Sequence, residues 1–455
     1  MQDSWEIDVD WQSLEDGEPE EAACFAEIGM RAYGVPLTQG HDKLLNSLKQ
    51  APLLSGYHLA LWFASNWWRL RWEPRRKSTA WALAHSMASI GEGYIWPDID
   101  FASDGRFVLL NARPTMDRPG TPFRYITPET TSVIAAAKFE AVVDEFVATV
   151  VQRLRDCCPG ATALDATWAA VGEERASNTV SAKRKLEALL GLDPDDMDDG
   201  RYAELQADGE RIGVTALQEL AAASEHGAIP TAGELQEMGR ASGHPCGGFV
   251  RFGQAAPVRA NEPPMAASGQ AWQAGGATAR WLRDQQRLGA DPITNRMLSE
   301  LCGLQPRVLQ KARTATGPGL AFLARGMAGK NCVVLRAKRE EGRRFELARL
   351  LGDELMREKD EPLKDEPFSL ATRSYTYRQK AQRAFAAELL SPFQAVDGML
   401  DGDYSEEAQQ DVAAHFNVSA VAIRTQLANH ERIDRFEPEW GAAGAGLRAA
   451  PGVRP

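Results

Sequence analysis

Residues 56–72, with the sequence GYHLALWFASNWWRLRW, form the segment that most restricts how this chain can fold. If the segment is helical, apolar side chains point to almost every side of it. A helix that is apolar all round is stable only when other elements surround it. The segment therefore predicts a buried helix inside a globular domain.

The segments that follow supply further elements of such a domain. The stretches YIWPDIDFA and RFVLLNA flank Ser103-Asp104-Gly105, and Asp-Gly is a strong hairpin signal because both residues tolerate positive φ. Next, TSVIAAAKFEAVVDEFVATVVQRLRD spaces its apolar residues three and four apart, which predicts one long amphipathic helix. We expect residues 1–158 to form an α+β domain, and no motif in it indicates a function.

Composition narrows the class of protein. The 455 residues suffice for about three domains of ordinary size. No run of about 18 apolar residues occurs and the N-terminus is acidic, which argues against a membrane span or a secretory signal. The six cysteines lack the C-x-x-C spacing, so reduced thiols in the cytoplasm are expected. The net charge of −12 argues against a nucleic-acid surface along the whole chain, but a local basic patch remains compatible with it.

Residues 159–252 have a helical pattern. The stretch KRKLEALLGLDP places Gly191 where a helix C-cap favours glycine, and Thr231 with Glu234 matches a capping box. We expect this part of the chain to be a helical region between two domains.

Two stretches read as unstructured. Residues 253–276 are rich in Ala, Gly, Pro and Gln and contain little that could form a core, which predicts a linker. The tail 434–455 contains GAAGAGLRAAPGVRP and is expected to be disordered for the same reason.

The C-terminal third, residues 277–433, has a recognisable order of elements. Two short helices, the second with Thr294 as N-cap, precede two strands in GLAFLARGMAGKNCVVLRAKR. The apolar helix RRFELARLLGDELM follows, and then the helix RQKAQRAFAAELLSP. The segment QQDVAAHFNVSAVAIRTQLANHERI closes the series and fits a helix-turn-helix unit.

This order of elements resembles the ImmA/IrrE family of zinc metallopeptidases. In that family the motif helix commonly begins with Arg-Arg-Phe, two more residues and then Ala-His-Glu, and here RRFELA occupies residues 343–348. The family's later Phe-Ala-Ala-Glu-Leu-Leu-x-Pro run is matched by residues 385–392, and VAAHFNVSAVAIRTQL resembles its Phe-x-Val-Ser segment. The resemblance implies a zincin-like domain of helices around a small sheet.

The departures from the family pattern fall on the chemistry. By resemblance, the two ligand histidines would lie at Arg349 and Asp353, the general base at Leu350 and the third ligand at Gln379. Arginine cannot lose its proton to bind a metal, and leucine cannot take a proton from water. We therefore expect no catalytic residues and no cofactor. Zinc would bind only if substitute ligands existed. The nearest other carboxylates, Glu346, Glu354 and Glu388, lie at other angular positions around their helices than the ligand positions.

Two alternatives describe what takes the place of the metal. Arg349 and Asp353 are four residues apart, so they share one face of the helix and could pair. Buried beside Gln379, they would form a polar network that joins two helices and lines a remnant cleft. Otherwise, the two charges simply face solvent.

Three other groups of residues are weaker candidates. His85, Asp98 and Asp100 could form a metal or acid–base cluster, but a histidine on an apolar helix and surface aspartates on a strand are the favoured explanation. The run NWWRLRWEPRRK places Arg69, Arg71, Arg75 and Arg76 among tryptophans, which suits single-stranded nucleic acid or a phosphorylated ligand. These arginines could instead pair with acids, for example those in residues 1–30. The helix-turn-helix-like segment offers Arg424 and Arg432 to DNA, but in the resembled family it belongs to the peptidase-like fold.

The expected function follows from the resemblance. Active members of the family are associated with cleavage of helix-turn-helix repressors in stress or mobile-element regulation. The resemblance therefore implies a non-catalytic relative that binds a regulatory protein partner. The alternatives are an active metalloendopeptidase with rearranged ligands and a nucleic-acid-binding transcriptional regulator.

Overall fold

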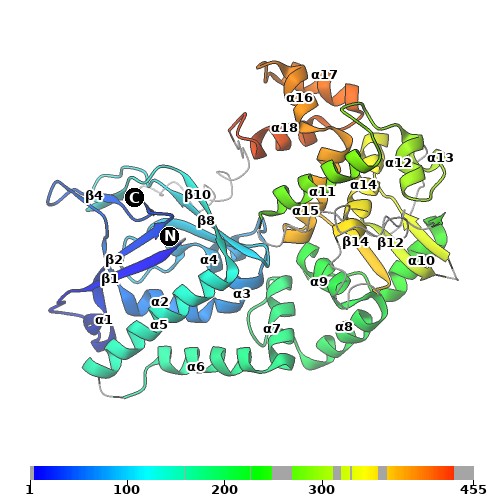
Figure 1. The fold of residues 1–455 in the computed structure, drawn as a ribbon. Coiled ribbons are helices and arrows are strands. Elements are labelled where there is room, and N and C mark those ends of the chain that lie inside the picture. The colour runs from blue at the N-terminus through cyan, green and yellow to red at the C-terminus, as the bar shows by residue number, and fades with distance from the viewer. Residues whose placement is uncertain are drawn as a thin grey trace, which may run out of the picture. The chain divides into compact units, whose positions relative to one another are not determined.

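The computed structural model describes residues 5–158, 160–225, 227–247, 269–310, 319–327, 330–356 and 366–434. These residues form two compact units, one up to residue 198 and one from residue 199 onward. Both units contain helices and antiparallel sheets, so the expected mixed α+β class is confirmed (Figure 1). Among the described helices, none is long and apolar enough to cross a membrane.

The first unit contains three small sheets and the helices around them. Its sheets have the strand orders β1-β2-β3, with β6 also paired to β2, then β10-β8-β7 and β5-β4-β9. The elements are β1 (Glu6–Trp11), α1 (Pro19–Ala23), β2 (Phe25–Ala32), β3 (Val35–Pro36), β4 (Gly40–Asp42), β5 (Ser47–Lys49), β6 (Leu53–Ser55), α2 (Gly56–Ser65), α3 (Trp67–Trp72), α4 (Thr79–His85), a 3-10 turn (Met87–Ser89), β7 (Asp98–Ser103), β8 (Phe107–Arg113), β9 (Phe123–Tyr125), β10 (Thr130–Ala135), α5 (Ala136–Cys157), α6 (Ala163–Ala176) and α7 (Asn178–Leu190).

The sequence predicts much of this unit correctly. The apolar segment 56–72 forms α2 and α3, which break at Asn66 and bury most of their side chains. Strands β7 and β8 form the expected hairpin, and Gly105 has a φ of 92° in its turn. The expected long helix, however, begins only at Ala136: residues 130–135 form β10, because this β-branched stretch pairs with β8.

The second unit contains one four-stranded antiparallel sheet with the order β11-β13-β12-β14. Its apolar core joins α11, α12, α14, α15 and the last helices to one another and to this sheet. The elements are α8 (Asp199–Ile212), α9 (Val214–Ala223), α10 (Ala232–Ser242), β11 (His244–Cys246), α11 (Ala271–Gln285), α12 (Asn295–Leu301), α13 (Arg307–Gln310), β12 (Ala321–Met327), β13 (Lys330–Val334), α14 (Glu340–Met356), β14 (Phe368–Ala371), α15 (Tyr377–Leu390), α16 (Phe393–Leu400), α17 (Glu406–Phe416) and α18 (Ala420–Asn429).

The two units do not follow the expected boundaries at residues 158 and 252. Helix α6 packs on the first unit, where Trp168 contacts Trp67 with a ring-centroid separation of 5.5 Å and Glu174 accepts from Nε1 of Trp68 at 2.6 Å. Strand β11 instead pairs with β13 in the sheet of the second unit. The expected helical region is therefore divided between the units.

The expected linker also ends earlier than the composition indicates. Residues 253–268 lie outside the described part, but residues 271–276 already belong to α11, which the Gln270 and Gln273 side chains cap. The alanines and glycines of this stretch allow α11 to approach α15 closely. Apart from its first residue, the expected disordered tail lies outside the described residues.

Gly275 marks the closest approach between α11 and α15 and supports a stability prediction. A Cβ atom at Gly275 would lie 2.2 Å from the carbonyl oxygen of Ala381 and 2.7 Å from the nitrogen of Phe385, both backbone atoms. We expect Gly275→Ala to push the helices apart and to lower the free energy of unfolding by about 1–3 kcal/mol. The control is Gly276→Ala, whose Cβ would meet only the flexible end of Arg280. Equal melting temperatures for the two variants, measured by calorimetry, would contradict this packing.

Candidate functional site

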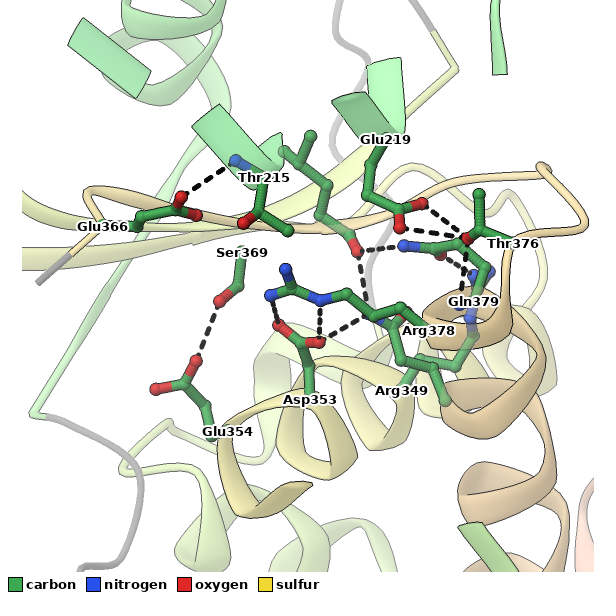
Figure 2. Close-up of polar contacts among 12 residues, drawn as sticks. Thr215, Glu219, Arg349, Asp353, Glu354, Glu366, Ser369, Thr376, Arg378 and Gln379 are labelled. Atoms are coloured by element: carbon green, nitrogen blue, oxygen red, sulfur yellow. Dashed lines mark hydrogen bonds and ion pairs between the residues drawn. The ribbon is translucent and has the colours of Figure 1, made fainter. Parts of the chain in front are cut away.

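Helix α14 carries the degenerate motif and presents its residues in two directions. Leu347, Leu350 and Leu351 lie in the apolar core, and Leu350 is 0% exposed. Arg349 and Asp353 instead face α15 and the end of β14 (Figure 2). The position that would hold a general base therefore points into the core, while the two ligand positions point toward α15.

Arg349 is bonded to the strand end and to the position of the third ligand. Its Nη2 donates to the carbonyl oxygen of Thr372 at 2.6 Å and to Oε1 of Gln379 at 2.5 Å. Oε1 of Gln379 also accepts from the nitrogen of Thr372 at 2.8 Å, while its Nε2 donates to the carbonyl oxygen of Leu370 at 3.0 Å. Burial lowers the pKa of Arg349 to about 9, and the charge of Arg383 acts in the same direction.

Asp353 is held by two side chains of α15. Nε and Nη2 of Arg378 each donate to one carboxylate oxygen of Asp353 at 2.6 Å, which is the bidentate geometry of a strong ion pair. Nε2 of Gln382 donates to Oδ1 at 2.9 Å and to the carbonyl oxygen of Leu370 at 3.1 Å. Burial lowers the pKa of Arg378, but the charge and the hydrogen bonds of Asp353 outweigh it, so that this pKa is raised overall.

These contacts decide between the two expected environments of Arg349 and Asp353. The side chains are 8% and 3% exposed, so the alternative in which both face solvent is wrong. Both residues belong to a buried polar network that links α14 to α15, but they do not form the expected pair: Arg349 bonds to Thr372 and Gln379, and Asp353 pairs with Arg378. The bonds between the helices involve Gln379, as expected, and also Arg378 and Gln382.

Helix α9 contributes a further carboxylate to this network from far upstream in the chain. Glu219 is buried, and its oxygens accept from Oγ1 of Thr376 at 3.0 and 2.9 Å (Figure 2). They also accept from Oγ of Ser374 at 3.2 Å. Burial raises the pKa of Glu219, while the charge of Arg378 and the hydrogen bond from Thr376 oppose that shift. Thr376 is also the N-cap of α15, so α9 lies over the start of the helix that carries Gln379.

A second polar group lies beside the network, at the edge strand. Arg325 donates to Glu354 and to Oγ of Ser369 at 2.8 Å, and Oγ of Ser369 donates to Oε1 of Glu354 at 2.8 Å. Two residues before β14, Oε1 of Glu366 accepts from the nitrogen of Thr215 at 2.8 Å. This bond attaches the first turn of α9 to the sheet side of the site (Figure 2).

The remaining carboxylates near the motif do not gather into a metal site. Glu346 accepts from the backbone nitrogens of Arg336 and Ala337 at 2.8 and 3.1 Å, and Glu388 pairs with Arg280 at 3.4 Å. Within the described ranges, no three His, Cys, Asp or Glu side chains form a group that could hold a metal ion. The residues at the three ligand positions do not fit zinc either, because arginine supplies no lone pair and Asp353 and Gln379 are bonded to protein donors.

The arginines of the first unit have structural partners. Arg69 pairs with Glu73 at 2.8 Å and Asp193 at 3.1 Å, Arg71 pairs with Glu140, Arg76 pairs with Glu73 at 3.4 Å, and Arg75 lies 5.8 Å from the ring centroid of Trp81. The pairing of these arginines with acids is therefore observed, but the acids that pair with Arg69 and Arg71 do not come from residues 1–30. Residues 1–30 instead contain β1 and most of β2.

The other two candidate groups are also part of the scaffold. His85 is fully buried, its Nδ1 lies 2.8 Å from the carbonyl oxygen of Trp81, and burial lowers its pKa to about 3. Asp98 and Asp100 both pair with Arg113, at 2.9 and 2.5 Å. The structure therefore gives His85 and the aspartates separate partners.

The helix-turn-helix-like segment has the expected shape. Helices α17 and α18 are joined through Asn417, which has a φ of 51°. Arg424 is exposed, Arg432 pairs with Asp397 at 2.9 Å, and Ile423 and Leu427 of α18 lie in the apolar core. The segment is therefore integrated into the second unit.

Sequence reasoning did not identify Arg378, Gln382 or Glu219. The first two flank Gln379 at positions one before and three after it, so their helical spacing could have revealed them. Glu219 interrupts the otherwise apolar face of VTALQELAAA, and a single acid on such a face is a weak signal of a buried partner.

Comparisons of the chain with protein-family models, with curated proteins and with solved structures find no match. The functional assignment therefore depends on the residues and their geometry.

Proposed function

We propose that the chain is a non-catalytic relative of the ImmA/IrrE peptidases that acts by binding a regulatory protein. The proposal starts from the three sequence segments that resemble the family in the family's order. Its second support is the arrangement of α14 and α15 beside the edge strand β14, which is compatible with a zincin-like layout.

The observation that carries the proposal is the state of the four motif positions. Arg349, Asp353 and Gln379 are hydrogen-bonded to protein groups, and Leu350 is in the core. A zinc peptidase needs ligands with free lone pairs, an open coordination position and a base that reaches the bound water. None of the four residues supplies these features. The helix pair is therefore expected to act as a scaffold, and the function to consist of binding.

The resemblance also indicates which partner to test first. Active members of the family act on helix-turn-helix repressors, so a repressor of the host organism is the first partner to examine. A pseudo-enzyme is expected to bind such a repressor and to leave its chain intact.

The first test measures metal and cleavage together. The untagged chain, purified after growth with zinc, is expected to contain less than about 0.1 zinc per chain by elemental mass spectrometry, because the motif positions offer no free ligand set. Each helix-turn-helix repressor of the host organism is then purified and incubated with the chain and zinc. The expected result is a complex in size-exclusion chromatography and an uncut repressor in intact-mass spectra. Near-stoichiometric zinc, or cleavage of a repressor, would overturn the proposal.

A further inference from the structure

The site on β14 and α15 is covered by one short helix, α9, and the chemistry of this contact indicates a ligand. Helix α9 presents Ala216, Leu217, Glu219 and Leu220 as buried residues, whereas Val214 is 61% exposed. The only acid of this helix thus lies on its buried face. A carboxylate in such a position costs free energy unless the opposing surface supplies hydrogen bonds or positive charge.

The opposing surface supplies both. The hydroxyl groups of Ser374 and Thr376 donate to the carboxylate of Glu219, and hydrogen bonds to a charged group are stronger than those between neutral groups. Arg378 and Arg383 lie close enough to interact electrostatically with the same carboxylate. The segment from Ser374 to Arg383 therefore forms a seat for an acidic side chain, which we term the α15 seat.

The arginines also explain why the seat requires an acid. Arg349 donates to neutral oxygens of Thr372 and Gln379, and Arg383 donates to the neutral carbonyl oxygen of Ser374 at 2.9 Å. Among the described residues, the carboxylates that act on these two positive charges do so through space, and Glu219 acts on both. Without Glu219, both hydroxyl donors would lose their charged acceptor and the arginines a nearby counter-charge.

Helix α9 is attached differently from the rest of the second unit. The large apolar core of this unit includes residues of α11, α14, α15 and α18, but no residue of α9. The chain enters α9 through Gly213, which has a φ of 103°. A helix of ten residues is marginal on its own, so its place depends on the polar bonds of Thr215 and Glu219 and on its packing against α8 and β14.

We infer that α9 is an intramolecular ligand of the α15 seat, and that a helix of a partner protein takes its place. The partner helix carries one glutamate on a face of otherwise small or aliphatic residues, as α9 does. The inference rests on the proposed function for the existence of a partner. It adds the surface that the partner uses and the chemistry that the surface selects. It also requires α9 to dissociate from the α15 seat before the partner binds. A separate peptide with the sequence of α9 would therefore inhibit binding of the partner.

The test uses a fluorescent peptide with the sequence of residues 213–225 and the full-length chain. In the wild type, α9 outcompetes the peptide because it is tethered at high effective concentration. Glu219→Lys puts a positive charge among the arginines and is expected to expel α9. This variant should bind the peptide at least tenfold more tightly than the wild type in fluorescence anisotropy. The matched control is Val214→Lys, which adds the same charge at an exposed position of α9 and should bind like the wild type. A peptide with alanine in place of the glutamate should bind at least tenfold more weakly to the Glu219→Lys chain.

Two results would overturn the inference. One is a Glu219→Lys chain with the wild-type melting temperature that does not bind the peptide, or binds the alanine peptide equally well. If Glu219→Lys does not fold, hydrogen exchange of the wild-type chain tests whether α9 dissociates from the α15 seat. Amides of α9 should then exchange at least tenfold faster than those of α14 and α15, and equal protection would show that α9 is a fixed part of the fold. Neither result depends on zinc content, so the inference and the proposed function can fail separately.

Discussion

Replacement of Asp353 by alanine is expected to destabilise the second unit by about 3–5 kcal/mol, because it removes the buried carboxylate that pairs with Arg378, whose side chain is only 21% exposed. The change also removes one of the two acceptors of Nε2 of Gln382, which donates to Oδ1 of Asp353 and to the carbonyl oxygen of Leu370. Differential scanning calorimetry of the full chain should show a lower melting temperature for the transition of this unit.

A surface pair of the same unit provides the matched control for this prediction. Asp397 pairs with Arg432 at 2.9 Å, but both side chains are partly exposed to solvent. Asp397→Ala should therefore cost less than about 1 kcal/mol. The double change Asp353→Ala with Arg378→Met should recover part of the lost stability, since it removes the unpaired charge as well. Equal melting temperatures for the two single alanine variants would contradict the buried network.

The second large effect concerns the position of the missing general base. Leu350→Glu is expected to destabilise the unit by several kcal/mol, because it moves a carboxylate into an apolar core and removes a fully buried leucine. The variant restores one letter of the peptidase motif, yet it should yield little soluble folded protein. Its yield and its melting temperature are the measurements.

The control at the same position is Leu350→Met, which conserves volume and should cost less than about 1.5 kcal/mol. If Leu350→Glu melts like the wild type, position 350 faces an open surface and the orientation of α14 is wrong. That result would also favour the alternative in which the side chain at position 350 reaches the site, as the general base of an active peptidase does.

Local signals in the sequence were the most reliable. Gly191 ends α7 with a φ of 77°, and Thr231 with Glu234 forms the expected capping box. The hairpin formed where the Asp-Gly pair predicts it, but only Gly105 adopts a positive φ, because Asp104 still bonds to Phe107 across the turn. Each of these features is determined by residues within one turn of each other, so neighbouring chain segments cannot easily override it.

Features that depend on distant contacts were predicted less well. The stretch before Ala136 fits a helix by its spacing, but pairing with β8 makes it a strand. The small residues before Ala277 read as a linker, although close packing on α15 explains them equally well. At the site, the grouping of Arg349, Asp353 and Gln379 follows from helical spacing and the family resemblance. Glu219 could not be placed there, because only the folded chain brings α9 to α15.

The pairing of β11 with β13 affects how this chain can be divided. Residues 248–268 separate α8, α9, α10 and β11 from α11 and the later elements, yet both groups belong to the same compact unit. A protease that cut within this stretch would produce two fragments that still share a sheet and a buried carboxylate. An excised fragment that began at α11 would lack a strand beside β13 and an acid beside Ser374 and Thr376. A cut in this stretch would thus split the second unit into complementary halves, whereas the border between the two compact units lies at Asp198.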